Sequence, residues 1–239
     1  MSEDTTKKED APTPAGSTRL VFPHWANYLL PMLALAAMGG GVYVPVLLGF
    51  GASPKTLAVG YQPIQPVPYS HALHAGKLHI DCRYCHTTVE KTPFAAIPPT
   101  QTCMNCHTGI KTESKALQPI RDSWASGKPM PWIKVHNLAQ YVYFNHSAHV
   151  NHGVGCASCH GRIDRMDVVQ QAKPLSMGWC LECHRNPELN LRPKDQITNM
   201  SWTTPGDTDE EKLAFGLDLK KEYGIRDATY MTSCSTCHR

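Results

Sequence analysis

The residues best suited to bind a cofactor are ten cysteines, and all ten lie in one repeated pattern. The pattern is Cys-x-x-Cys-His, and five copies of it use every cysteine in the 239-residue chain. A disulfide framework does not place a histidine after every pair of cysteines, so the pattern excludes such a scaffold. Motifs 1 to 5, in chain order, are Cys82/Cys85/His86, Cys103/Cys106/His107, Cys156/Cys159/His160, Cys180/Cys183/His184 and Cys234/Cys237/His238.

The spacing within each motif is that of covalent haem c attachment. Two thiols three positions apart on one turn can add to the two vinyl groups on one edge of a porphyrin. The histidine that follows then lies under the iron as its proximal ligand. We therefore predict five haems c, with thioether bonds from the ten cysteines and proximal ligation by His86, His107, His160, His184 and His238.

Two other uses of paired cysteines fit less well. Zinc ribbons combine two Cys-x-x-Cys pairs per metal ion, so they require an even number of pairs, and this chain has five. Thioredoxin-like sites occur singly and need no histidine. The net charge of +3 is too small to indicate a nucleic-acid partner.

Five irons also need ligands on their distal sides, and eight histidines lie outside the motifs. Two matching segments precede motifs 1 and 3: Tyr-Ser-His-Ala-Leu-His at 69–74 and Phe-Asn-His-Ser-Ala-His at 144–149. The doubled histidine resembles that of small tri- and tetrahaem cytochromes. In those proteins the first histidine binds the haem of the next motif and the second binds another haem. The resemblance implies that His71 serves motif 1 and His146 motif 3, with His74 and His149 bound to other haems.

His136, which precedes an aromatic run at 141–144, is our fifth distal candidate. The alternative is that Met166 or Met177 replaces a histidine. A thioether ligand would then raise the reduction potential of that haem. We assign ordinary polar roles to His79 and His152, which lie too close to their motifs to reach the distal side.

A second feature of the sequence is an apolar N-terminal segment. Residues 20–54 contain no Asp, Glu, Lys or Arg, and within them 28–50 would form a helix of about 34 Å. That length crosses a hydrocarbon core of about 30 Å. We predict an uncleaved transmembrane anchor at 20–54 and a disordered cytoplasmic tail at 1–19. A cleaved signal peptide is the alternative, although its apolar region is usually shorter.

Residues 55–239 would then lie on the periplasmic face, where haem attachment takes place. This region has too few residues per haem for five separate protein cores, so we expect the haems to pack together as the core. Frequent prolines predict short α-helices and loops with little β-structure. The fold class is thus a multihaem cytochrome c with one N-terminal transmembrane helix.

The motifs also carry an internal repeat. Their first cysteines are 21, 53, 24 and 54 residues apart. This alternation predicts two dihaem modules, about 66–125 and 140–200, and a fifth haem at the C-terminus. Whether motif 5 repeats motif 1 or motif 4 stays open.

Several longer stretches together resemble the pentahaem cytochrome c subunit of bacterial alternative complex III, a quinol:electron acceptor oxidoreductase. The resemblance rests on the anchor, the five motifs, the segment 144–149 and Pro-Leu-Ser-Met-Gly-Trp-Cys-Leu-Glu-Cys-His-Arg-Asn-Pro at 174–187. It implies a single-pass protein of the bacterial inner membrane. The implied partners are an iron–sulfur subunit related to molybdopterin oxidoreductases, quinol-binding membrane subunits and a monohaem cytochrome c.

An iron with protein ligands on both faces cannot bind substrate, so we predict an electron-transfer subunit without catalytic residues. Electrons would run from quinol oxidised in partner subunits, through iron–sulfur clusters and these haems, to a soluble carrier or an oxidase. One alternative is a self-sufficient membrane quinol dehydrogenase of the type that partners nitrite and nitrate reductases. That type requires a haem motif close to the anchor, whereas Lys55 and Cys82 are 27 positions apart. A standalone multihaem carrier is the other alternative.

Overall fold

The structure, a computed structural model, describes residues 22–238, so the predicted tail at 1–19 lies outside the described residues. The chain divides into two compact units, one ending at Gly49 and the other beginning at Phe50. Between residues 22 and 238 the elements are all helical, and the one β-type pairing is an isolated bridge between Val154 and Leu191. The prediction of a helical fold with little β-structure is therefore confirmed.

The N-terminal unit is built on α1 (Ala26–Val46), which continues as a π-helical stretch, η1 (Leu47–Gly51). In the described part of the chain, Ala26–Gly51 is the one helix long and apolar enough to cross a membrane. No residue of α1 is buried, and apolar side chains cover the whole helix, as expected for a helix that faces lipid. It corresponds to the candidate anchor predicted at 20–54.

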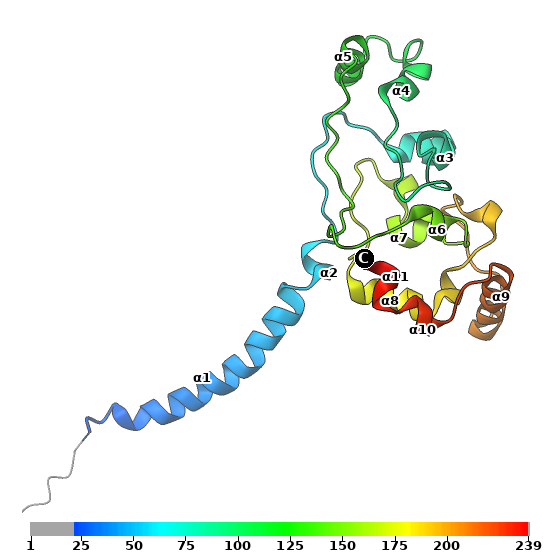
Figure 1. Cartoon of the computed structure of the whole chain (residues 1–239). Coiled ribbons are helices and arrows are strands. Elements are labelled where there is room, and N and C mark those ends of the chain that lie inside the picture. The colour runs from blue at the N-terminus through cyan, green and yellow to red at the C-terminus, as the bar shows by residue number, and fades with distance from the viewer. Residues whose placement is uncertain (1–21, 239) are drawn as a thin grey trace, which may run out of the picture. The chain divides into compact units, whose positions relative to one another are not determined.

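The second unit, Phe50–Arg239, contains all five motifs and is called the motif domain below. Figure 1 shows its short helices joined by long irregular connections. In chain order the elements are α2 (Pro54–Leu57), η2 (Ala72–Lys77), α3 (Cys82–Cys85), α4 (Thr100–His107), η3 (Lys115–Leu117), α5 (Gln118–Ser126), α6 (His146–Val150), α7 (Cys156–His160), η4 (Ile163–Arg165), α8 (Met177–Arg185), η5 (Pro187–Asn190), η6 (Lys194–Gln196), α9 (Asp209–Glu222), α10 (Ala228–Met231) and α11 (Cys234–Cys237).

The two cysteines of every motif lie on one short helix: α3, α4, α7, α8 or α11. Side-chain caps fix where two of these begin. Asp81 accepts a hydrogen bond from the Arg83 N–H at the start of α3, and Ser176 accepts one from the Trp179 N–H at the start of α8. Pro99 immediately precedes α4 in an extended conformation. The two caps therefore help to place the cysteines of motifs 1 and 4 on a single helical turn.

The longest helix of the motif domain, α9, follows the second predicted module. It begins with a capping box in which Thr208 and Glu211 satisfy each other's backbone N–H groups. Its Gly216 packs so closely on the Glu188 carbonyl of η5 that a side chain would not fit. The partly buried Lys220 pairs with Glu188 at 3.0 Å. These contacts hold α9 against η5, which follows α8.

Few apolar side chains of the motif domain are buried. Val67, Met104 and Ile120 form one small cluster beside α4 and α5, with Trp132 packed against it. Among the described residues the other buried apolar side chains are Leu191, Ile197 and Leu219. The side chains thus form small, separate clusters and no continuous core, as expected if the haems themselves fill the interior.

Candidate haem centres

The ten motif cysteines are all free and none is in a disulfide. In residues 22–238 no three His, Cys, Asp or Glu side chains converge as a site for a bare metal ion. Burial raises the pKa of the Cys159 thiol to about 11, so this thiol is protonated at neutral pH. This arrangement does not suit a zinc site and leaves the thiols available for thioether bonds.

The histidines test whether the residues fit haem iron. An imidazole nitrogen binds a transition metal at about 2.0–2.1 Å, so two imidazoles on opposite sides of one ion have ring centres about 6 Å apart. His74 and His107 are 6.3 Å apart, and His149 and His184 are 6.1 Å apart. The rings of His146 and His160 are 6.4 Å apart, with an interplanar angle of 9°. In each pair, a distal candidate lies at the iron-spanning distance from a proximal histidine.

A hydrogen-bond pattern shared by seven of the ten candidate ligand histidines supports the same interpretation. A ligand histidine usually donates its second ring N–H to a carbonyl or carboxylate, which fixes the ring and leaves the other nitrogen for the metal. Nδ1 lies 2.7–3.1 Å from a backbone carbonyl oxygen in His74, His86, His107, His146, His149, His184 and His238, and the acceptors are Ser70, Ala96, Ile110, Pro93, Asn145, Met231 and Tyr141 respectively.

Burial also favours the ligand form of the imidazoles. Desolvation, reinforced by the neighbouring His136, His146, His86 and His71, lowers the pKa of His160 to about 3. Desolvation and the neighbouring His86 and His74 lower the pKa of His71 to about 4. Both rings are therefore neutral at physiological pH, which is the form that binds a metal ion.

His136 stands apart from the three pairs. Its Nε2 is buried without a hydrogen-bond partner, as expected of a nitrogen reserved for a metal. Its ring centre lies only 4.4 Å from that of His160, edge to face at 81°. Because no iron fits between rings so close together, His136 and His160 cannot be the two axial ligands of one haem. The role of His136 as a distal ligand stays a prediction.

Motif 5 differs from motifs 2, 3 and 4, because the aromatic ring beside its histidine, among the described residues, is that of a tyrosine. The His238 ring lies 5.8 Å from that of Tyr141, whose carbonyl accepts from His238 Nδ1. Of the two methionine candidates, Met177 is exposed, and the end of Met166 lies near Gly161. The distal ligand of this haem therefore stays open.

The two matching segments before motifs 1 and 3 have the same local geometry. Tyr69 lies 4.8 Å from His71 at 87° and 4.5 Å from His74 at 22°. Phe144 lies 4.7 Å from His146 at 87° and 4.6 Å from His149 at 25°. In both segments one aromatic ring thus supports two histidines in the same way, which is what the proposed dihaem repeat requires.

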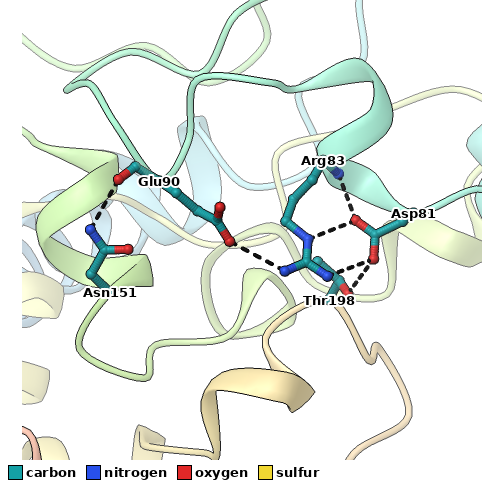
Figure 2. A network of polar contacts seen from close by, with 5 residues as sticks. All are labelled: Asp81, Arg83, Glu90, Asn151 and Thr198. Atoms are coloured by element: carbon teal, nitrogen blue, oxygen red, sulfur yellow. Dashed lines mark hydrogen bonds and ion pairs between the residues drawn. The ribbon is translucent and has the colours of Figure 1, made fainter.

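Sequence reasoning missed a polar network beside motif 1 (Figure 2). Arg83, which follows the first cysteine of that motif, donates two hydrogen bonds to Asp81 at 2.9 and 3.1 Å and one to Glu90 at 3.2 Å. Thr198 donates to Asp81 at 2.9 Å, and Asn151 donates to the Glu90 carbonyl at 3.0 Å. Because Thr198 is 117 positions from Asp81, no spacing rule could have found this contact.

The network predicts a pH-dependent contribution to stability. The hydrogen bond from Arg83 holds the pKa of Asp81 at about 2, below its usual value. A lowered folded-state pKa stabilises the fold above the unfolded pKa of about 3.9, and that stabilisation is lost as pH falls through about 2. We expect Asp81→Asn, which can still cap α3, to lower the melting temperature of the haem-loaded chain at pH 7, and to lower it less at pH 3, where part of the stabilisation is already lost.

The matched variant for this prediction is Asp81→Ala, which also removes the cap. At pH 7 its free energy of unfolding should be about 1 kcal/mol lower than that of Asp81→Asn. Thermal unfolding followed by circular dichroism at the two pH values measures both effects. If Asp81→Asn lowers the melting temperature as much at pH 3 as at pH 7, the lowered pKa of Asp81 is not the source of the effect.

Arg192 is a second residue that the sequence did not single out. Its side chain is buried, it packs on Gly155 immediately before motif 3, and its guanidinium lies 5.0 Å from the Trp202 ring centre. One guanidinium nitrogen donates to the Asn199 carbonyl at 3.0 Å. A Cβ at position 155 would collide with Arg192, so Gly155 allows Arg192 to support the start of α7.

Comparison with known proteins agrees with this picture. No protein-family model matches the chain. Over 169 residues the chain is 27% identical to the "Menaquinone reductase, multiheme cytochrome c subunit" of Nitratidesulfovibrio vulgaris strain Hildenborough, a match that covers 61% of this chain and 79% of the relative. The helical fold without strands between residues 22 and 238, the N-terminal candidate membrane helix and this relative together place the chain in the multihaem cytochrome c fold class.

Proposed function

We propose that the chain is the electron-transfer subunit of a membrane-bound quinol-oxidising complex and carries five covalently bound haems c. The observation that carries this proposal is the set of three histidine pairs at iron-spanning distance, each joining a motif histidine to a histidine outside the motifs. The relative from N. vulgaris, named as a subunit of a menaquinone reductase, supports a quinol-linked role.

Each residue type has a distinct task in this function. The cysteines fix the haems, and the backbone carbonyls orient the ligand histidines through Nδ1. The haem iron supplies one-electron chemistry by cycling between Fe(II) and Fe(III). At the haems of motifs 2, 3 and 4, ligation by two histidines would keep the potential low and block access of substrate to iron. There the chain would conduct electrons and contribute no catalytic residue.

The finer assignments rest on the resemblance to alternative complex III. In this proposal, Ala26–Gly51 anchors the chain once in the bacterial inner membrane with the motif domain in the periplasm. The partners are an iron–sulfur subunit related to molybdopterin oxidoreductases, quinol-binding membrane subunits and a monohaem cytochrome c. Electrons arrive from quinol through the iron–sulfur clusters and leave to a soluble carrier or a terminal oxidase.

The haem count is directly measurable. We expect the intact, denatured chain to have the mass of the polypeptide plus five haems, because thioether bonds survive denaturation. Mass spectrometry and the pyridine haemochrome spectrum measure the count independently. Fewer than five haems on the fully matured protein would overturn the assignment for at least one motif.

Purification of the tagged chain from native membranes in mild detergent tests the assembly. We expect an iron–sulfur subunit and quinol-binding membrane subunits to co-purify, and quinol to reduce the haems only in that assembly. An untagged strain processed in parallel is the control. Recovery of the chain alone, still able to oxidise a quinol analogue, would support the self-sufficient dehydrogenase instead. Recovery alone without that activity would support a standalone carrier.

A further inference from the structure

The five motifs contact one another in an order that differs from their order in the chain. Motif 2 adjoins motif 1: the Asn105 side chain of motif 2 donates to the Tyr84 hydroxyl of motif 1 at 3.3 Å. One short segment also serves both motifs. His74, on η2, lies 6.3 Å from His107 of motif 2, and His71, the distal candidate for motif 1, is the N-cap of the same element.

Motif 1 adjoins motif 3, although motif 2 separates them in the chain. The connection involves the network of Figure 2: Thr198 donates to Asp81 at 2.9 Å, immediately before motif 1. The neighbouring Ile197 carbonyl accepts from the Cys156 N–H of motif 3 at 3.1 Å. The segment 197–198 therefore ties motif 1 to motif 3.

Helix α6 joins motif 3 to motif 4. Its two histidines, His146 and His149, lie at iron-spanning distance from His160 of motif 3 and His184 of motif 4. The same helix is fixed to the loop after motif 1, because His146 Nδ1 donates to the Pro93 carbonyl at 2.8 Å and Asn151 donates to the Glu90 carbonyl at 3.0 Å. Motif 3 thus lies between motifs 1 and 4.

Motif 4 adjoins motif 5. His184 Nδ1 donates to the carbonyl of Met231 at 2.9 Å, and Met231 ends α10 immediately before motif 5. Helices α8 and α10 are in contact. The four contacts described here give the order 2–1–3–4–5, with motifs 2 and 5 at the ends.

The arrangement of the helices marks the same two ends. Figure 1 shows that, within the motif domain, α4 lies with α5 at one end, and α8, α10 and α11 lie at the other. A haem attached to motif 2 would therefore lie at one end of the domain, and a haem attached to motif 5 at the other.

We infer that the haems form a single line in the order 2–1–3–4–5, and that electrons enter and leave this chain at the haems of motifs 2 and 5. The inference rests on the proposed function for its electron-transfer meaning. Each transfer oxidises one haem iron by one electron and reduces the next by one electron, and no bond forms or breaks. Motif 1, the first in the chain, is an interior member of the line.

Two variants separate this order from the chain order. Cys82→Ala with Cys85→Ala removes the haem of motif 1, and Cys103→Ala with Cys106→Ala removes that of motif 2. In the complex, rapid mixing with quinol is followed by the absorbance of reduced haem. For the inferred order, loss of motif 1 separates one haem from the other three, so the fast phase splits. Loss of the terminal motif 2 leaves four contiguous haems. If electrons enter at motif 5, all four are still reduced in one fast phase. If electrons enter at motif 2, all four lose fast reduction together.

The opposite result overturns the inference: a split phase when motif 2 is removed, with none when motif 1 is removed. A second measurement needs neither the partner subunits nor a variant chain. Iron anomalous scattering from crystals of the haem-loaded wild-type chain gives the iron positions directly. We expect the iron of motif 2 to lie closer to that of motif 1 than to that of motif 3, and the reverse would refute the order. A failed pull-down would affect only the proposed function.

Discussion

Without covalent haem attachment, the motif domain is expected not to fold. The described residues bury only six apolar side chains: Val67, Met104, Ile120, Leu191, Ile197 and Leu219. Helices α3, α7 and α11 have four or five residues, whereas an isolated helix needs about 12–15 residues to be even marginally stable in water. Because conformational entropy opposes folding at every ordered residue, these small clusters are insufficient on their own.

Expression in a host that lacks haem-attachment enzymes tests this expectation. We expect most of the far-ultraviolet helix signal of the motif domain to be lost, no cooperative melting transition, and rapid proteolysis of residues 50–239. The same chain produced with the attachment enzymes is the matched control. A haem-free chain that melts cooperatively with the helix content of the control would contradict the view that haems form the core.

The second large effect is expected at His149. This histidine is largely buried on α6, and its ring faces that of His184 at 6.1 Å. His149→Ala should remove one axial ligand from the haem of motif 4 and convert that haem, about one-fifth of the total, from low spin to high spin. Low-temperature electron paramagnetic resonance of the oxidised protein measures the conversion.

The chain offers a close control for this variant. His152, three positions later, is exposed and also has Nδ1 on a backbone carbonyl, that of Ala148, at 2.6 Å. His152→Ala should leave every haem low-spin. His149→Met should restore a low-spin haem with a raised potential, because a thioether can replace the imidazole. A fully low-spin spectrum for His149→Ala, or a high-spin signal for His152→Ala, would show that the ligand assignment is wrong.

The same comparison applies in the first predicted module. His74 faces His107 at 6.3 Å, whereas His79 is exposed and has a positive φ of 53°.

From the sequence, His74 and His149 were expected to bind haems other than those of the motifs that follow them directly. The structure pairs them with motifs 2 and 4, the second motif of each predicted module. The pairing depends on how each module folds back on itself, which histidine spacing does not reveal.

The sequence by itself determined the cofactor chemistry and the kind of fold. Each motif contains its own two thiols and proximal histidine within five residues, so haem attachment depends on a single turn of helix and can be recognised locally. The short helices and the candidate anchor also follow from local composition: frequent prolines interrupt the motif domain, and an uncharged stretch predicts a helix where Ala26–Gly51 lies.

The tertiary structure alone decided which motifs are neighbours. The contacts that set the order 2–1–3–4–5 join residues far apart in the chain, such as Asp81 with Thr198 and His184 with Met231. The spacing of the motifs is compatible with several orders, because first cysteines that are 21 to 54 residues apart leave connecting segments that can reach many positions. Tertiary packing selects one of them, and with it motifs 2 and 5 as the two ends of the line.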